Sequence, residues 1–285
     1  MRKIFFYLFL FFLAFFQYTY ADTLSVSVTP ETIIQGDPVL VVISGLVSTS
    51  TTPELTFDGK KIPVFMYQAK PTALIGIDIH KTPGTYNLVL KTRDGATVTN
   101  KLVVNEREKI EQPMGIPEKL GGNTVQSQNT MVSSLAQENA LLANLPTGKK
   151  AFWTEPFRFP LEKIFVTDIY GYSRKTGEYN LTHKGTDFRA TEGTPVYAMN
   201  RGVVRVSREG RNYGKTIVVD HGLGVMTFYL HLSKIKVYTG QLVTKSQIIG
   251  LSGQTGYVDA PHLHLSIRIN NTSINPVEFM KFFAN

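Results

Sequence analysis

The sequence predicts an all-β protein in which two β domains are joined by a helical linker. Residues 22–105 form short segments of alternating apolar and polar residues, and the same pattern returns over residues 151–285. The stretch between them, residues 106–150, is polar and lacks this alternation. At 285 residues, with 42% hydrophobic content, the chain is long enough and apolar enough for two packed cores.

Residues 1–21 have the features of a signal peptide. Arg2 and Lys3 precede the apolar run "IFFYLFLFFLAFF", and the small residues Thr19 and Ala21 offer a cleavage point before Asp22. The run is too short to span a bilayer comfortably, so we expect export to the periplasm or cell envelope. The alternative is an uncleaved anchor, which would associate the protein with a membrane. Export argues against nucleic acid as a partner.

Net charge and cysteine content limit the binding partners and the metal ligands that this protein can have. Thirty basic and twenty-two acidic residues give a net charge of +8, or 8 − 2 = +6 without Arg2 and Lys3. Such a surface favours an anionic partner, for example a membrane surface or a cell-wall polymer. The chain has no cysteine, so it forms no disulfide, and any zinc site must use His, Asp or Glu.

Residues 22–105 predict about seven strands. The alternating segments are separated by the turn-forming pairs Asp58-Gly59, Pro83-Gly84 and Asp94-Gly95. For a segment of this length, we expect an immunoglobulin-like β-sandwich. Such a domain typically has a positioning role and does not itself catalyse a reaction.

Residues 106–150 predict a linker with one helix. The segment starts charged and is broken by Pro and Gly, after which Asn123 or Thr124 can cap a helix. The apolar residues at loosely helical spacing are Met131, Leu135, Leu141, Leu142 and Leu145. The polar face carries almost no basic residue, so we expect this helix to pack on a neighbouring domain and not on a membrane.

Five of the six histidines lie in the last β domain. His183 and Asp187 flank Gly185 and could supply one nitrogen and one oxygen ligand from a tight segment. His262 and His264 stand two apart in a predicted strand, so both side chains point to one face, where one can bind metal and the other can act on substrate.

The other three histidines stand in different surroundings. His231 lies in an alternating strand and joins the four residues above as a site candidate. His221 is expected to be a turn residue, at most at the rim of the site, and His80 lies in the first domain with no expected partner.

Several motifs in order along the chain resemble the lysostaphin/LytM-type zinc metallopeptidases, which are peptidoglycan endopeptidases of the duplicated-hybrid-motif fold. "HKGTD" matches H-x-G-x-D, "YLHLS" matches Tyr-x-His-Leu, and "PHLHL" matches H-x-H. The resemblance extends over about residues 160 to 280 and includes "GTPVYAMNRGVV", "VTKSQIIGLSGQTG" and "INPVEFM". It implies that residues 151–285 form a LytM-type antiparallel β-sheet peptidase domain.

The resemblance also implies roles for the site residues. His183, Asp187 and His264 would bind one zinc ion, and His231 and His262 would be the catalytic histidines that bind no metal. The aromatic-Gly-x-Arg stretch of the family is altered here, although Tyr170, Gly171 and Arg174 are present. Two tyrosines are therefore candidates for contacting the substrate or transition state, namely Tyr172 and Tyr179.

The implied activity is hydrolysis of the peptides of peptidoglycan in wall remodelling or cell-shape control. We expect a D,D-endopeptidase, with D,D-carboxypeptidase activity as an option and the oligomeric state left open. One rival is a catalytically inactive LytM-type scaffold that activates a murein amidase, and another is an adhesin that binds the wall. Because residues 106–150 are long, they could also fold across the site, with a side chain at the fourth position of zinc, and inhibit the enzyme.

Overall fold

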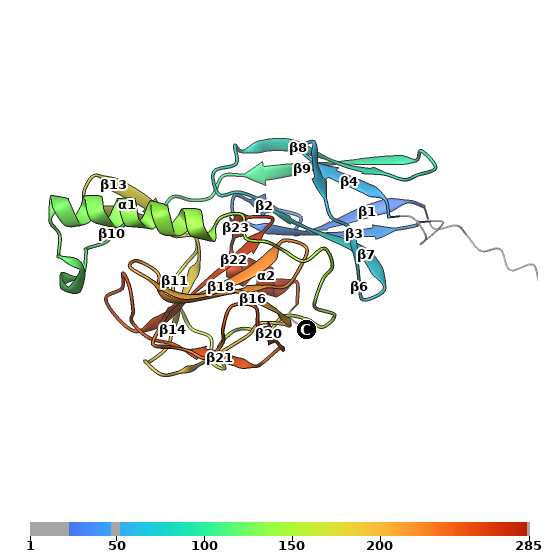
Figure 1. Cartoon of the computed structure of the whole chain (residues 1–285). Coiled ribbons are helices and arrows are strands. Elements are labelled where there is room, and N and C mark those ends of the chain that lie inside the picture. Colours follow the sequence, from blue (N-terminus) through green and yellow to red (C-terminus); the bar gives the residue numbers. More distant parts are fainter. Residues whose placement is uncertain (1–22, 47–51, 284–285) are drawn as a thin grey trace, which may run out of the picture.

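The computed structural model describes residues 23–46 and 52–283 (Figure 1). The predicted signal peptide lies outside the described residues. Within the described ranges, no helix is both long and apolar enough to cross a membrane. Strands dominate, which confirms the all-β prediction.

The first part of the chain forms two sheets around one core. Their strands are β1 (Ser25–Thr29), β2 (Ile33–Ile34), β3 (Pro38–Ser44), β4 (Glu54–Phe57), β5 (Lys60–Ile62), β6 (Phe65–Tyr67), β7 (Lys70–Gly76), β8 (Gly84–Lys91) and β9 (Thr97–Asn105). The sheet orders are β1-β3-β7-β6 and β2-β9-β8-β4-β5. Val39 and Val41 of β3 and Leu88 and Leu90 of β8 point into the shared core, as period-two alternation requires. The immunoglobulin-like topology and the boundary at residue 105 stay predictions.

The following segment contains the predicted helix. It comprises β10 (Glu111–Pro113), the 3₁₀ turn η1 (Glu118–Leu120) and helix α1 (Val125–Leu142). Thr124 is the N-cap, since its side chain accepts a hydrogen bond from the Ser127 amide. Met131 and Leu142 are buried against the last β domain, so the helix packs on protein, as expected.

The last part of the chain is built on one large sheet of order β11-β14-β22-β18-β17-β16-β20, with β23 beside β22. Smaller sheets are β15-β21-β19 and β10-β12-β13. The elements are β11 (Val166–Asp168), β12 (Ser173–Thr176), β13 (Tyr179–Thr182), β14 (Thr186–Arg189), β15 (Pro195–Tyr197), β16 (Gly202–Gly210), β17 (Gly214–Asp220), β18 (Val225–Leu232), β19 (Lys234–Ile235), β20 (Leu242–Val243), β21 (Ile248–Leu251), β22 (His262–Ile269), β23 (Thr272–Ile274) and helix α2 (Pro276–Lys281). Phe188, Tyr229 and Leu263 are fully buried in its core.

The two β parts share an aromatic contact. The Trp153 ring lies 5.3 Å from Phe65 and 5.0 Å from Tyr67 of the first part. Phe283, at the end of the described chain, lies 5.8 Å from the same indole ring. Burial of such large rings helps to hold the first part against the last part, where β7 contacts β22 and β23 (Figure 1).

Candidate metal centre

Sheet pairing brings His183, Asp187 and His264 together. His183 follows β13, Asp187 lies on β14, and the β14–β22 register places Asp187 directly opposite His264. A side chain at position 185 would meet His264, because a Cβ there would lie 2.3 Å from His264 Nε2. Gly185 therefore permits the close approach of the two strands.

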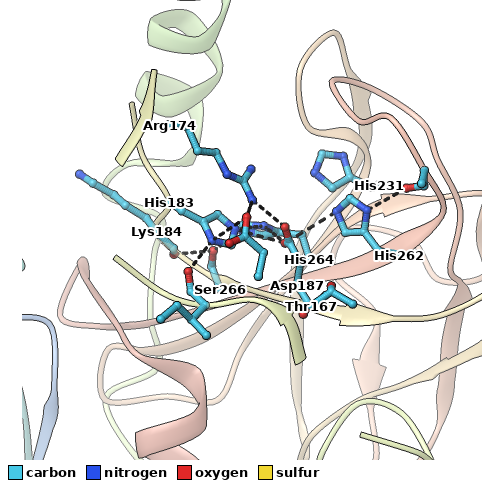
Figure 2. A network of polar contacts seen from close by, with 12 residues as sticks. Thr167, Arg174, His183, Lys184, Asp187, His231, His262, His264 and Ser266 are labelled. Carbon is cyan, nitrogen blue, oxygen red and sulfur yellow. Dashed lines mark hydrogen bonds and ion pairs between the residues drawn. The ribbon is translucent and has the colours of Figure 1, made fainter. Parts of the chain in front are cut away.

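The three side chains converge at short distances. His264 Nδ1 lies 2.7 Å from Asp187 Oδ1, His183 Nε2 lies 3.0 Å from His264 Nδ1, and His183 Nε2 lies 3.2 Å from Asp187 Oδ1. All three residues are buried, and one potential ligand atom from each lies within 4.8 Å of the others (Figure 2).

Hydrogen bonds on the side of each imidazole away from the cluster indicate which ring nitrogen faces the cluster without a proton. His183 Nδ1 lies 2.9 Å from the carbonyl oxygen of Ile169, which can only accept, so Nδ1 carries a proton and Nε2 is the nitrogen that the neutral ring offers to a metal. Ser266 Oγ donates to the Lys184 carbonyl oxygen at 2.8 Å and therefore accepts from His264 Nε2 at 2.9 Å. His264 Nδ1 is then bare as well.

The charge states suit a cation. Burial lowers the pKa of His264 to about 4, so the ring is neutral at pH 7. Burial alone would raise the pKa of Asp187, but the adjacent His183 and His264 outweigh it and hold that pKa well below its ordinary value. When both imidazoles are neutral, their two unprotonated nitrogens and one carboxylate oxygen of Asp187 face one point with no proton between them. This donor set fits zinc and leaves room for a fourth ligand.

His231 and His262 form a second pair beside this cluster. His231 Nδ1 donates to the Thr255 carbonyl oxygen and His262 Nδ1 donates to that of Ala260, each at 2.9 Å, so both rings keep Nε2 as an acceptor. His262 Nε2 lies 3.7 Å from Asp187 Oδ1, and the two rings lie 5.1 Å apart (Figure 2). Burial, then the neighbouring His262 and His264, hold the pKa of His231 well below its usual value.

The backbone at His231 is unusual. Its φ is 62°, in the left-handed region that a non-glycine residue rarely adopts. The His231 amide donates to the Tyr213 carbonyl oxygen at 3.0 Å, which ties this conformation to the turn between β16 and β17. Strain of this kind costs about 1–3 kcal/mol and is found where a side chain must be aimed at a site.

His183 and His264 of the metal cluster and His231 of the second pair line a cleft of about 540 Å³. One wall carries His231 and His264 of the main sheet together with His183, which follows β13, and another wall is helix α1. The helix residues in this wall are Met131, Leu135, Asn139 and Leu142. Glu138 of α1 supplies no ligand, because its carboxylate accepts from the backbone amides of Asn212 and Tyr213 at 2.8 and 2.9 Å.

The structure corrects one expectation from the sequence, since His221 is fully buried and not at a rim. Tyr172 and Tyr179 are not among the residues that line the cleft, and the Tyr179 hydroxyl donates to Asn129 of α1. Contact of these tyrosines with the substrate stays a prediction. His80 of the first part lines the cleft together with Asp78.

Two cleft residues carried no sequence signal. Tyr213 and Tyr257 line the cleft where the candidate tyrosines do not. The Tyr213 hydroxyl donates to Asn139 and that of Tyr257 to the Gly115 carbonyl oxygen, so both meet the segment between the two β parts. These contacts join residues far apart in sequence, which no local motif reports.

The fold and the site define a β-sheet protein with a candidate metal centre of two histidines and one aspartate. Residues 181–276 match the family described as Peptidase family M23, so this chain contains an M23 peptidase domain, of the LytM type that its motifs resemble. That match contains all five site candidates.

Known proteins of similar sequence support the same family. The chain is 47% identical over 96 residues to peptidoglycan DD-endopeptidase ShyA of Vibrio cholerae, covering 34% of this chain and 22% of that protein. It is 40% identical over 95 residues to DD-carboxypeptidase/endopeptidase Mpg of Neisseria meningitidis, covering 33% and 22%. The chain thus aligns with less than a quarter of the length of these two relatives.

A solved structure extends the likeness in fold beyond the peptidase domain. A putative peptidase M23 from Pseudomonas aeruginosa superposes with a TM-score of 0.56 at 24% identity, covering 88% of this chain and 96% of that one. At this identity the likeness concerns the fold alone.

Proposed function

We propose that this protein is an exported, zinc-dependent peptidoglycan hydrolase that cuts the peptides of murein. One observation carries the proposal: three bare lone pairs of His183, Asp187 and His264 converge beside two histidines that present free Nε2 atoms. The M23 match and the names of the relatives support the same activity.

The roles follow from this geometry. His183 Nε2, Asp187 Oδ1 and His264 Nδ1 would hold one zinc ion, which supplies an acidified water and polarises the scissile carbonyl when bound. His262 and His231 would take the proton of the nucleophile at Nε2 and return it to the leaving amine. Their Nδ1–H bonds to the Ala260 and Thr255 carbonyl oxygens keep each Nε2 directed at the site.

The substrate class follows from charge and similarity. Murein is an anionic mesh and would attract a mature chain of net charge +6, counted as 8 − 2 without Arg2 and Lys3. The two relatives are named for DD-endopeptidase and DD-carboxypeptidase/endopeptidase activity. We favour cleavage of D,D cross-links between stems, by a protein of the periplasm or cell envelope.

The rival roles predict different results. An inactive scaffold that activates an amidase does not need a complete site, yet all five candidate residues are present and close together. An adhesin would bind the wall without releasing peptides. Neither rival explains why both His183 and His264 turn bare nitrogens toward one carboxylate oxygen.

Helix α1 would restrict access to the site. It walls the cleft and is anchored through Glu138, so a polymeric substrate must pass beside it or displace it. The segment would inhibit by covering the cleft, since Glu138 binds backbone amides and does not reach the ligand cluster.

The experiment is metal removal and restoration on the chain from Asp22 onward. Treatment with a chelator should abolish release of soluble peptides from purified murein, and stoichiometric zinc should restore it. Peptide release that persists in the metal-free protein would refute the proposal.

A further inference from the structure

The two oxygens of the Asp187 carboxylate have separate partners. Oδ1 faces the metal cluster, 2.7 Å from His264 Nδ1 and 3.2 Å from His183 Nε2. Oδ2 points away and accepts from Arg174 Nη2 at 2.7 Å. Figure 2 shows the Arg174 side chain reaching down to this carboxylate from β12.

Arg174 holds a second carboxylate at the same time. Its Nη2 also donates to Asp168 Oδ2, and the β11–β14 register pairs Asp168 directly with Asp187. Two like charges opposite each other on neighbouring strands repel unless a cation lies between them. Arg174 provides that cation, and its side chain is only 19% exposed.

We propose that Arg174 is a positioning residue that reserves Oδ2 and leaves Oδ1 as the single oxygen that Asp187 offers to the metal. A carboxylate free to turn could present both oxygens and occupy the position that the water or substrate needs. The inference rests on the proposed zinc site. It assigns Arg174 no contact with the substrate.

The planar guanidinium suits this task. The two hydrogens of Nη2 lie in a fixed plane, so one nitrogen donates to Asp168 and Asp187 in defined directions. A lysine ammonium keeps the charge but is more strongly hydrated and less directional. Arg174→Lys should therefore preserve charge and lose part of the positioning.

The test compares Arg174→Gln and Arg174→Lys with wild type in two metal measurements. Competition with a chelator should show zinc affinity falling about 10- to 100-fold in Arg174→Gln and less in Arg174→Lys. With cobalt(II) in place of zinc, the visible absorption of Arg174→Gln should weaken. This is the change expected when the metal goes from four ligands to five.

Arg205→Gln is the matched control. It breaks another partly buried ion pair, Arg205–Asp220 at 2.7 Å, in the same part of the chain but outside the metal cluster. It should leave zinc affinity and the cobalt spectrum unchanged, which separates positioning from a general loss of stability.

Three results would overturn the inference. The first is wild-type zinc affinity and a wild-type cobalt spectrum in Arg174→Gln. The second is a loss of zinc affinity in Arg205→Gln equal to that in Arg174→Gln. The third, should Arg174→Gln not fold, is wild-type zinc affinity and a wild-type cobalt spectrum in Arg174→Lys. Wild-type protein that binds no zinc would instead refute the proposed function and remove the site on which the inference depends.

Discussion

Asp187 and His264 are direct partners across the antiparallel strands β14 and β22, and their side chains meet at 2.7 Å between Oδ1 and Nδ1. Two of the three candidate ligands are therefore placed by sheet register. A one-residue slip would turn one of these side chains to the other face of the sheet.

Removing one ligand should remove the metal. We expect His264→Ala to bind less than a tenth of the zinc that wild type binds at equal free zinc, because two ligands hold the ion far less tightly than three. Elemental analysis of the purified variant measures this, and peptide release from murein should be lost with the metal. Zinc bound at one per chain in His264→Ala would contradict the ligand assignment.

The second histidine pair should behave differently. His262→Ala and His231→Ala should keep zinc at the wild-type ratio, while the rate of peptide release drops about 10²- to 10⁴-fold through loss of proton transfer. Zinc content and rate are measured on the same preparation. Loss of zinc in either variant would make that histidine a ligand.

The first β part should contribute to substrate binding. His80 lines the cleft next to Asp78, so His80→Ala should raise KM for a murein peptide by about two- to tenfold, the value of one hydrogen bond, with zinc content unchanged. Steady-state kinetics give KM and kcat separately. Lys101→Ala, an exposed change on β9 of the same part, is the control and should have no effect.

The carboxylate of Glu138 should hold helix α1 in place. Glu138→Ala leaves the Asn212 and Tyr213 amides without their acceptor, which costs about 1–3 kcal/mol for each buried group. Hydrogen exchange of residues 125–142 should accelerate, and peptide release from polymeric murein should rise as the cleft opens. Gln137→Ala, exposed on the same helix, should change neither. An unchanged rate despite faster exchange would show that the helix does not restrict access.

His221 should make the fold sensitive to acid. Burial lowers its pKa to about 4, so the folded protein binds fewer protons than the unfolded chain between pH 6.5 and 4. Its contribution is present above pH 6.5 and is lost as pH falls toward 4, by roughly 3 kcal/mol in total. Denaturant titrations at several pH values measure this, and His221→Gln should flatten the slope. An unchanged slope would contradict the assignment.

The sequence predicts the all-β fold, the linker helix and the five site candidates, because alternation, caps and short motifs are local signals. The positions of His80, Tyr213 and Tyr257 in the cleft were not predictable in this way. Each depends on packing between segments far apart in sequence. Arg174 could be recognised in the sequence as part of the aromatic-Gly-x-Arg stretch. Its contact with Asp187 could not be predicted, because it depends on the β11–β14 pairing.

The most direct test is mass analysis of the fragments that the zinc-loaded protein releases from murein of defined cross-linking. We predict that cross-linked dimers are converted to monomeric stem peptides with the D,D bond cleaved, and that His264→Ala protein releases none. Intact cross-links after prolonged digestion, or equal release by His264→Ala, would contradict a zinc-dependent murein endopeptidase.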